Sequence, residues 1–104
     1  MKEIWESERE QKNIQEMAGF FKLLSTPSRI QLLLLLINRE SGVTELADKM
    51  KVTQSSVSHQ LNLLKLNRLV TSRREGRKIL YMLCDEKTKQ ILLSWATKVY
   101  RKIE

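Results

Sequence analysis

Short polar side chains crowd the first two turns of a segment with helical spacing, residues 53–64 (TQSSVSHQLNLL). Serine and threonine stabilise a helix interior poorly, because their side chains compete for backbone hydrogen bonds. The same groups are well suited to capping a helix or to hydrogen bonding with a ligand, and glutamine can pair with the edge of adenine. The segment therefore predicts either a capped, solvated helix end or a polar binding face.

The other residues of the sequence form no pattern that is typical of an enzyme active site. The chain has one histidine, His59, and one cysteine, Cys84, too few ligands for a metal-activated hydrolase. Neither Asp48 nor Asp85 belongs to a Ser–His–Asp arrangement, and the three glycines stand apart instead of forming a phosphate loop. We therefore predict no enzyme activity, no catalytic residue and no cofactor.

Length and composition predict one soluble domain spanning residues 1–104. The chain is 41% hydrophobic and 30% charged, and its longest unbroken apolar run, Leu32 to Ile37, is too short to span a bilayer. The charged N-terminal stretch has no apolar signal-peptide core. A lone cysteine excludes an internal disulfide and fits a reducing compartment. We expect a cytoplasmic protein with no membrane partner.

Positive charge is concentrated in the middle of the chain. The net charge is +7, and residues 44–83 carry eight Lys/Arg against three Asp/Glu, whereas residues 1–43 carry six of each. A localised basic surface is typical of proteins that bind a polyanion such as nucleic acid. Charge that merely keeps the protein in solution is the alternative explanation.

Hydrophobic periodicity and helix breakers predict five helices and one β-hairpin, a mainly α fold. The helices are expected at about 8–24, 28–39, 45–50, 53–66 and 85–103, and the hairpin at 69–84. Thr26, Thr44 and Thr53 are the expected N-caps, with Pro27 at a first helical position. Apolar stripes follow the first helix, which Trp5 upstream would extend, and the last helix as far as Ile103.

The predicted helices 45–50 and 53–66 are separated by a very short turn, and the second is polar at its leading end, which indicates a helix-turn-helix. The hairpin that follows turns at Glu75-Gly76 and carries four cations within residues 73–78. Imperfect alternation in its first half leaves the strand register open. A basic hairpin directly after a helix-turn-helix is typical of a wing.

Several linked motifs resemble the ArsR/SmtB family of bacterial winged-helix repressors. They are residues 53–64, the LSTPSRI stretch at 24–30, Leu69-Val70, the RREGR stretch at 73–77, and residues 81–83. The resemblance covers roughly residues 20–83. It implies a winged helix-turn-helix homodimer assembled from the first and last helices. It also implies that residues 53–66, as recognition helix, and the wing at 69–84 bind a palindromic double-stranded DNA operator, and that an effector relieves repression.

A recognition helix enters the major groove by its N-terminal turns, where serines allow close approach. The predicted DNA-binding residues are Thr44, Gln54, Ser55, Ser56, Ser58 and His59 on the helices, and Arg73, Arg74, Arg77 and Lys78 on the wing. Competing interpretations treat Ser56 as a residue that turns toward the core and completes the cap, and His59 as an ordinary surface residue. The predicted dimerisation residues are Met17, Phe21, Leu92, Trp95 and Val99.

The effector is not indicated by these residues. The resemblance implies two known metal sites, one with cysteines on the helix before the recognition helix, the other with Asp and His on the last helix. Residues 44–50 contain no cysteine, and of the second set only Asp85 is present, with Lys98 and Arg101 near the other end of the helix. We predict no metal site and no regulation by zinc. Alternative functions are an effector-independent countersilencer or architectural DNA-binding factor, and a winged-helix module for protein or RNA contacts.

Overall fold

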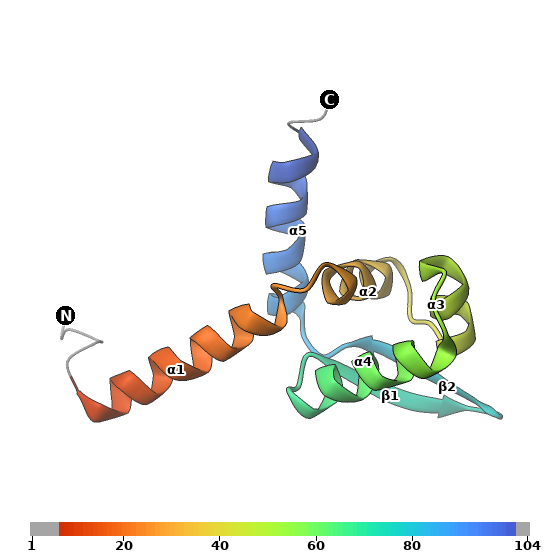
Figure 1. Cartoon of the computed structure of the whole chain (residues 1–104), viewed down its shortest axis with the longest axis horizontal. Coiled ribbons are helices and arrows are strands. Elements are labelled where there is room, and N and C mark those ends of the chain that lie inside the picture. Colours follow the sequence, from red (N-terminus) through yellow and green to blue (C-terminus); the bar gives the residue numbers. More distant parts are fainter. Residues whose placement is uncertain (1–6, 102–104) are drawn as a thin grey trace. The chain divides into compact units, whose positions relative to one another are not determined.

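A computed structural model describes residues 7–101 and contains the five predicted helices and the two-stranded hairpin (Figure 1). Trp5 and Ile103, which were predicted to extend the apolar stripes of the first and last helices, lie outside the described residues. In chain order the elements are α1 (Glu8–Leu23), α2 (Pro27–Asn38), α3 (Val43–Met50), α4 (Gln54–Leu66), β1 (Val70–Glu75), β2 (Lys78–Leu83) and α5 (Glu86–Arg101). The chain divides into two units, one ending at Ile30 and one beginning at Gln31.

The first unit is dominated by α1, which begins with a capping box. Ser7 Oγ accepts a 3.1 Å hydrogen bond from the backbone N–H of Glu10, and the Glu10 carboxylate accepts one of 3.1 Å from the N–H of Ser7. Its apolar stripe remains in solvent, since Met17 is 58% exposed and Phe21 is 56% exposed. No residue of α1 is buried. This helix therefore keeps an uncovered apolar face.

The second unit contains the core, to which α2 contributes Leu32, Leu33 and Leu36. The other buried apolar residues come from α3, α4, the start of the hairpin and α5, namely Leu46, Ala47, Val57, Leu61, Leu64, Leu69, Val70 and Leu92. Pro27 occupies the first position of α2, as predicted. Among the described residues no single helix is long and apolar enough to cross a membrane; α1 and α2 together meet that criterion by length and composition only.

The helix-turn-helix consists of α3 and α4, which pack against each other. The N-cap of α3 is Gly42 and not Thr44, which lies one residue inside the helix. The reason is tertiary: the neighbouring Ser41 exchanges backbone hydrogen bonds of 3.1 and 2.8 Å with Tyr81. This pairing holds the chain extended up to Gly42, and the helix begins immediately afterwards. Lys51 ends α3 in a left-handed conformation, with φ 58°.

The structure determines the strand register of the hairpin, which the sequence alone left open. Val70 pairs with Leu83 and Glu75 pairs with Lys78, so the two-residue turn is Gly76-Arg77 and not Glu75-Gly76. Gly76 has φ 64°, a left-handed value that glycine adopts without a steric penalty and that the first position of a type II′ turn requires. Ser41 forms an isolated bridge with Tyr81 on the outer edge of β2, so the segment before α3 lies beside the two-stranded hairpin.

Candidate nucleic-acid interface

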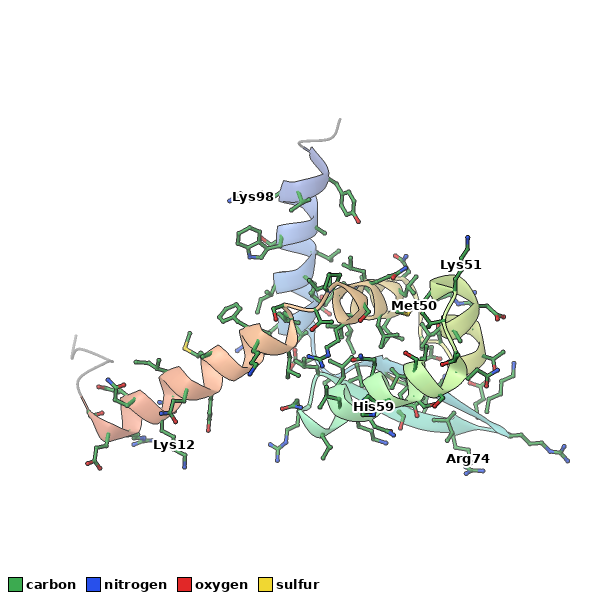
Figure 2. All side chains as sticks on the ribbon, in the orientation of Figure 1. Lys12, Met50, Lys51, His59, Arg74 and Lys98 are labelled. Carbon is green, nitrogen blue, oxygen red and sulfur yellow. The ribbon has the colours of Figure 1, made fainter. Side chains whose placement is uncertain are left out.

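Helix α4 is divided into a buried and an exposed face. Val57, Leu61 and Leu64 recur at helical spacing and lie in the core, whereas Gln54, Ser55, Ser56 and His59 are exposed and Ser58 is half-buried. Figure 2 shows His59 on α4. The predicted polar face therefore lies in solvent.

Thr53 fixes the start of this face. Its Oγ1 accepts a 3.0 Å hydrogen bond from the backbone N–H of Ser56, and Thr53 is the N-cap of α4 as predicted. The interpretation that Ser56 turns toward the core is wrong, because the residue is exposed and completes the cap through its backbone. The Ser56 side chain therefore remains available to a ligand together with Gln54 and Ser55.

A groove of about 1010 Å³ joins α3, α4 and the wing. Four of the predicted DNA-binding residues line it, Thr44 from α3, Ser58 from α4, and Arg77 and Lys78 from the wing. Four carboxylates also line this groove, those of Glu40, Glu45, Asp48 and Glu75, and Glu45 lies 3.8 Å from Arg39. The fold thus brings together residues from three elements, although the groove is mixed in charge.

The four wing cations are not equivalent. The side chains of Arg74, Arg77 and Lys78 are exposed and form no ion pair with any residue that the structure describes. Figure 2 shows the Arg74 side chain projecting away from the hairpin. These three cations remain available to a polyanion.

Arg73, predicted with the other three wing cations to bind DNA, is paired with carboxylates within the chain. Its guanidinium forms an ion pair with Glu40 and a second one, of 3.0 Å, with Glu75. The hydrogen bond from Arg73 to Glu40 is the main cause that raises the pKa of Arg73 above its ordinary value. Sequence reasoning missed Glu40 because it lies 33 residues before Arg73. It also missed a hydrogen bond from Lys65 at the end of α4 to Ser72 of β1.

The predicted dimerisation residues on α5 fall into two groups. Trp95 is 58% exposed and Val99 is 50% exposed, whereas Leu92 is 7% exposed. Leu92 is therefore buried within the chain, whereas Trp95 and Val99 lie in solvent. Lys98 places its Nζ 4.8 Å from the centroid of the Trp95 ring, a cation–π contact.

Asp85 has a structural role at the start of α5. Its Oδ1 accepts a 2.8 Å hydrogen bond from the backbone N–H of Thr88, and the hydrogen bonds with Thr88 hold the pKa of Asp85 below its ordinary value. Across residues 7–101, no three His, Cys, Asp or Glu side chains are grouped so that they could hold a metal ion. Cys84 is exposed and has a free thiol.

The family model for bacterial regulatory proteins of the arsR family matches residues 26–72. A transcriptional repressor SmtB homolog from Synechocystis is 49% identical over 68% of this chain and 54% of its own length. The biofilm growth-associated repressor of Agrobacterium fabrum is 33% identical over 79% of this chain and 70% of its own. The chain spans between about half and two thirds of the length of the first curated relatives it matches.

The fold has a similar solved structure over its whole length. The homodimeric winged helix-turn-helix DNA-binding domain of Mb0332 from Mycobacterium bovis superimposes with a TM-score of 0.84 and 26% identity, covering 100% of this chain and 94% of that one. The five helices and the wing therefore form a winged helix-turn-helix. With the matched family model and the similar relatives, these observations show that the chain belongs to the ArsR family of bacterial regulatory proteins.

Proposed function

We propose that this protein is a homodimeric transcriptional repressor that acts in the cytoplasm and binds a palindromic DNA operator through α4 and the wing. The observation that carries the proposal is the groove shared by α3, α4 and the wing, which lies beside the exposed polar face of α4. A helix with short polar residues at its leading end suits the major groove of DNA. The unpaired wing cations suit the phosphate backbone on either side.

Roles within this interface follow from the side chains. Gln54 and His59 are exposed and long enough to reach base edges, whereas Ser55 and Ser56 permit close approach of the helix. Thr44 and Ser58 line the groove and can hydrogen bond with phosphate oxygens. The wing contributes Arg74, Arg77 and Lys78 as sequence-independent contacts.

Dimer formation is supported by apolar surface that one chain leaves in solvent. On α1 the exposed residues Met17 and Phe21 share a helix face, and on α5 the exposed residues Trp95 and Val99 do the same. The similar Mycobacterium bovis domain is described as homodimeric. In a two-fold dimer the two copies of α4 meet half-sites about one helical turn of DNA apart, or a multiple of it.

Selection from a random-sequence duplex library tests the proposal. Repeated binding to the purified chain should enrich an inverted repeat whose half-sites are spaced by about one turn, or a multiple of it. The chain carrying both Gln54→Ala and His59→Ala should enrich no such repeat. Gln31→Ala, an exposed substitution on α2, is the matched control and should enrich the same repeat as the wild type. A wild-type selection that yields no common sequence contradicts the proposal.

We propose further that zinc does not regulate the protein. The carboxylate of Asp85 already accepts the capping hydrogen bond of α5, and Lys98 covers Trp95 with a positive charge near the other end of that helix. An effector must supply a coupling free energy of about 1–3 kcal/mol to release DNA. Affinity for the selected duplex should therefore be unchanged by a small excess of zinc in chelator-free buffer. A tenfold loss that Asp85→Ala abolishes contradicts this expectation.

A further inference from the structure

The ion pair between Arg73 and Glu40 crosses a strand of the wing. Arg73 pairs with Leu80 in the hairpin, while Ser41 pairs with Tyr81 on the outer edge of β2. Glu40 and Arg73 therefore lie on the two segments that flank β2, and their side chains meet over one face of that strand. The pair links the segment before α3 to the far strand of the wing.

Strand geometry separates Arg73 from its neighbour. Successive side chains of a strand point to opposite faces, so Arg73 and Glu75 share one face and Arg74 lies on the other. Glu75 Oε2 is 3.0 Å from Arg73 Nη1, which gives the guanidinium a carboxylate on each side. One cation between two carboxylates leaves this cluster with a net negative charge. Such a cluster does not attract phosphate.

Resting on the proposed function, we propose that Arg73 is a positioning residue of the wing, clamped by Glu40 and Glu75, and not a contact to the DNA backbone. The clamp reinforces the two backbone hydrogen bonds between Ser41 and Tyr81, of 2.8 and 3.1 Å. It thereby fixes the hairpin against the segment that leads into α3. The phosphate contacts of the wing then fall to Arg74, Arg77 and Lys78.

The effect of the clamp is local. Exposed ion pairs contribute little to global stability, and the side chains of Arg73, Glu40 and Glu75 are 49%, 37% and 61% exposed. Local opening of an edge segment requires far less free energy than global unfolding, so a weak pair can still change how often that segment opens. The segment from Glu40 to Gly42 is such an edge, since it is joined to β2 by a single bridge.

Amide hydrogen exchange of the DNA-free protein tests the clamp directly. Arg73→Gln should accelerate exchange of the Ser41 and Tyr81 amides about two- to fivefold, the size expected for one exposed ion pair. Arg74→Gln, the matched control on the same strand, should leave both rates unchanged. Glu40→Gln should accelerate exchange of the same two amides, and combining it with Arg73→Gln should add little further acceleration, because both changes break the same ion pair. Unchanged rates in Arg73→Gln overturn the proposal.

The salt dependence of binding to a random-sequence DNA duplex gives a second readout. Arg74→Gln should reduce the slope of log affinity against log salt by about 0.9, the value for one lost phosphate contact, whereas Arg73→Gln should leave the slope unchanged. An equal loss in both variants makes Arg73 a phosphate contact and overturns the proposal. If the wild type fails to bind DNA, the proposed function is wrong, and the exchange rates still decide the role of Arg73.

Discussion

Lys65 Nζ donates a 2.7 Å hydrogen bond to Ser72 Oγ and thereby joins the last turn of α4 to β1. Helix α4 and the wing are thus connected by side chains as well as by the chain itself. Ser72→Ala removes this connection and preserves the charge of Lys65. We expect operator binding to weaken by at most about 1.5 kcal/mol, the upper end of the net contribution of one hydrogen bond to stability. Thr71→Ala, exposed on the same strand, is the matched control and should bind as the wild type does.

The polar face of α4 should control sequence preference. Gln54→Ala and His59→Ala should each reduce affinity for the selected operator by about 1–3 kcal/mol, because a base contact is lost. Affinity for random duplex DNA should remain nearly constant, since neither side chain carries a phosphate contact. Competition binding with operator and random duplexes measures both quantities. Equal losses of affinity for both duplexes would show that these residues contact the DNA backbone and not the bases.

Capping and DNA contact can be separated at Thr53. Its hydroxyl accepts the hydrogen bond from Ser56, so Thr53→Ala should reduce the free energy of unfolding by about 0.5–2 kcal/mol. Thr53→Ser retains the capping oxygen and should recover most of that loss. Urea unfolding of the three proteins gives the comparison. If serine recovers stability and not operator affinity, the threonine methyl group contributes to DNA binding as well.

Leu92 and Trp95 should affect different equilibria. Leu92 is 7% exposed, so Leu92→Ala leaves a cavity and should lower the free energy of unfolding by about 2–5 kcal/mol. Trp95 is 58% exposed, so Trp95→Ala should mainly weaken the dimer, by at least about 2 kcal/mol if the ring is a central contact. Sedimentation at several concentrations measures dimer dissociation, and urea unfolding at fixed concentration measures stability. If Trp95→Ala has the same dimer dissociation constant as the wild type, Trp95 is not part of the dimer interface.

Asp85 should make the free energy of unfolding depend on pH in the acidic range. The hydrogen bonds from Thr88 lower the pKa of Asp85 in the folded state, so the ionised carboxylate favours folding. This contribution is fully present above the unfolded-state pKa of about 3.9 and is lost as pH falls through the lower folded-state pKa. Asp85→Asn keeps a capping side chain without the charge. Its stability difference from the wild type should disappear in strong acid, and a difference constant with pH would contradict this assignment.

Local chemistry was sufficient to predict much of α4. The cap at Thr53, the buried positions Val57, Leu61 and Leu64, and the exposed polar face between them depend on neighbours within two helical turns. The same holds for Pro27 at the start of α2 and for the existence of a hairpin between residues 69 and 84. Spacing along the chain therefore predicted these features. The linked motifs at residues 24–30, 53–64 and 69–83 likewise identified the family before any tertiary contact was known.

Contacts between distant segments decided the rest. Gly42 replaced Thr44 as the N-cap of α3 because Ser41 pairs with Tyr81, and no pattern near α3 reveals that pairing. Arg73 looked like its neighbour Arg74 in the sequence, and only the fold brought its guanidinium to Glu40, which lies on the other side of β2. Leu92 and Trp95 were both predicted to be dimerisation residues, and only packing within the chain separated the buried leucine from the exposed ring. In each case the deciding partner is remote in the chain, so periodicity and propensity carry no information about it.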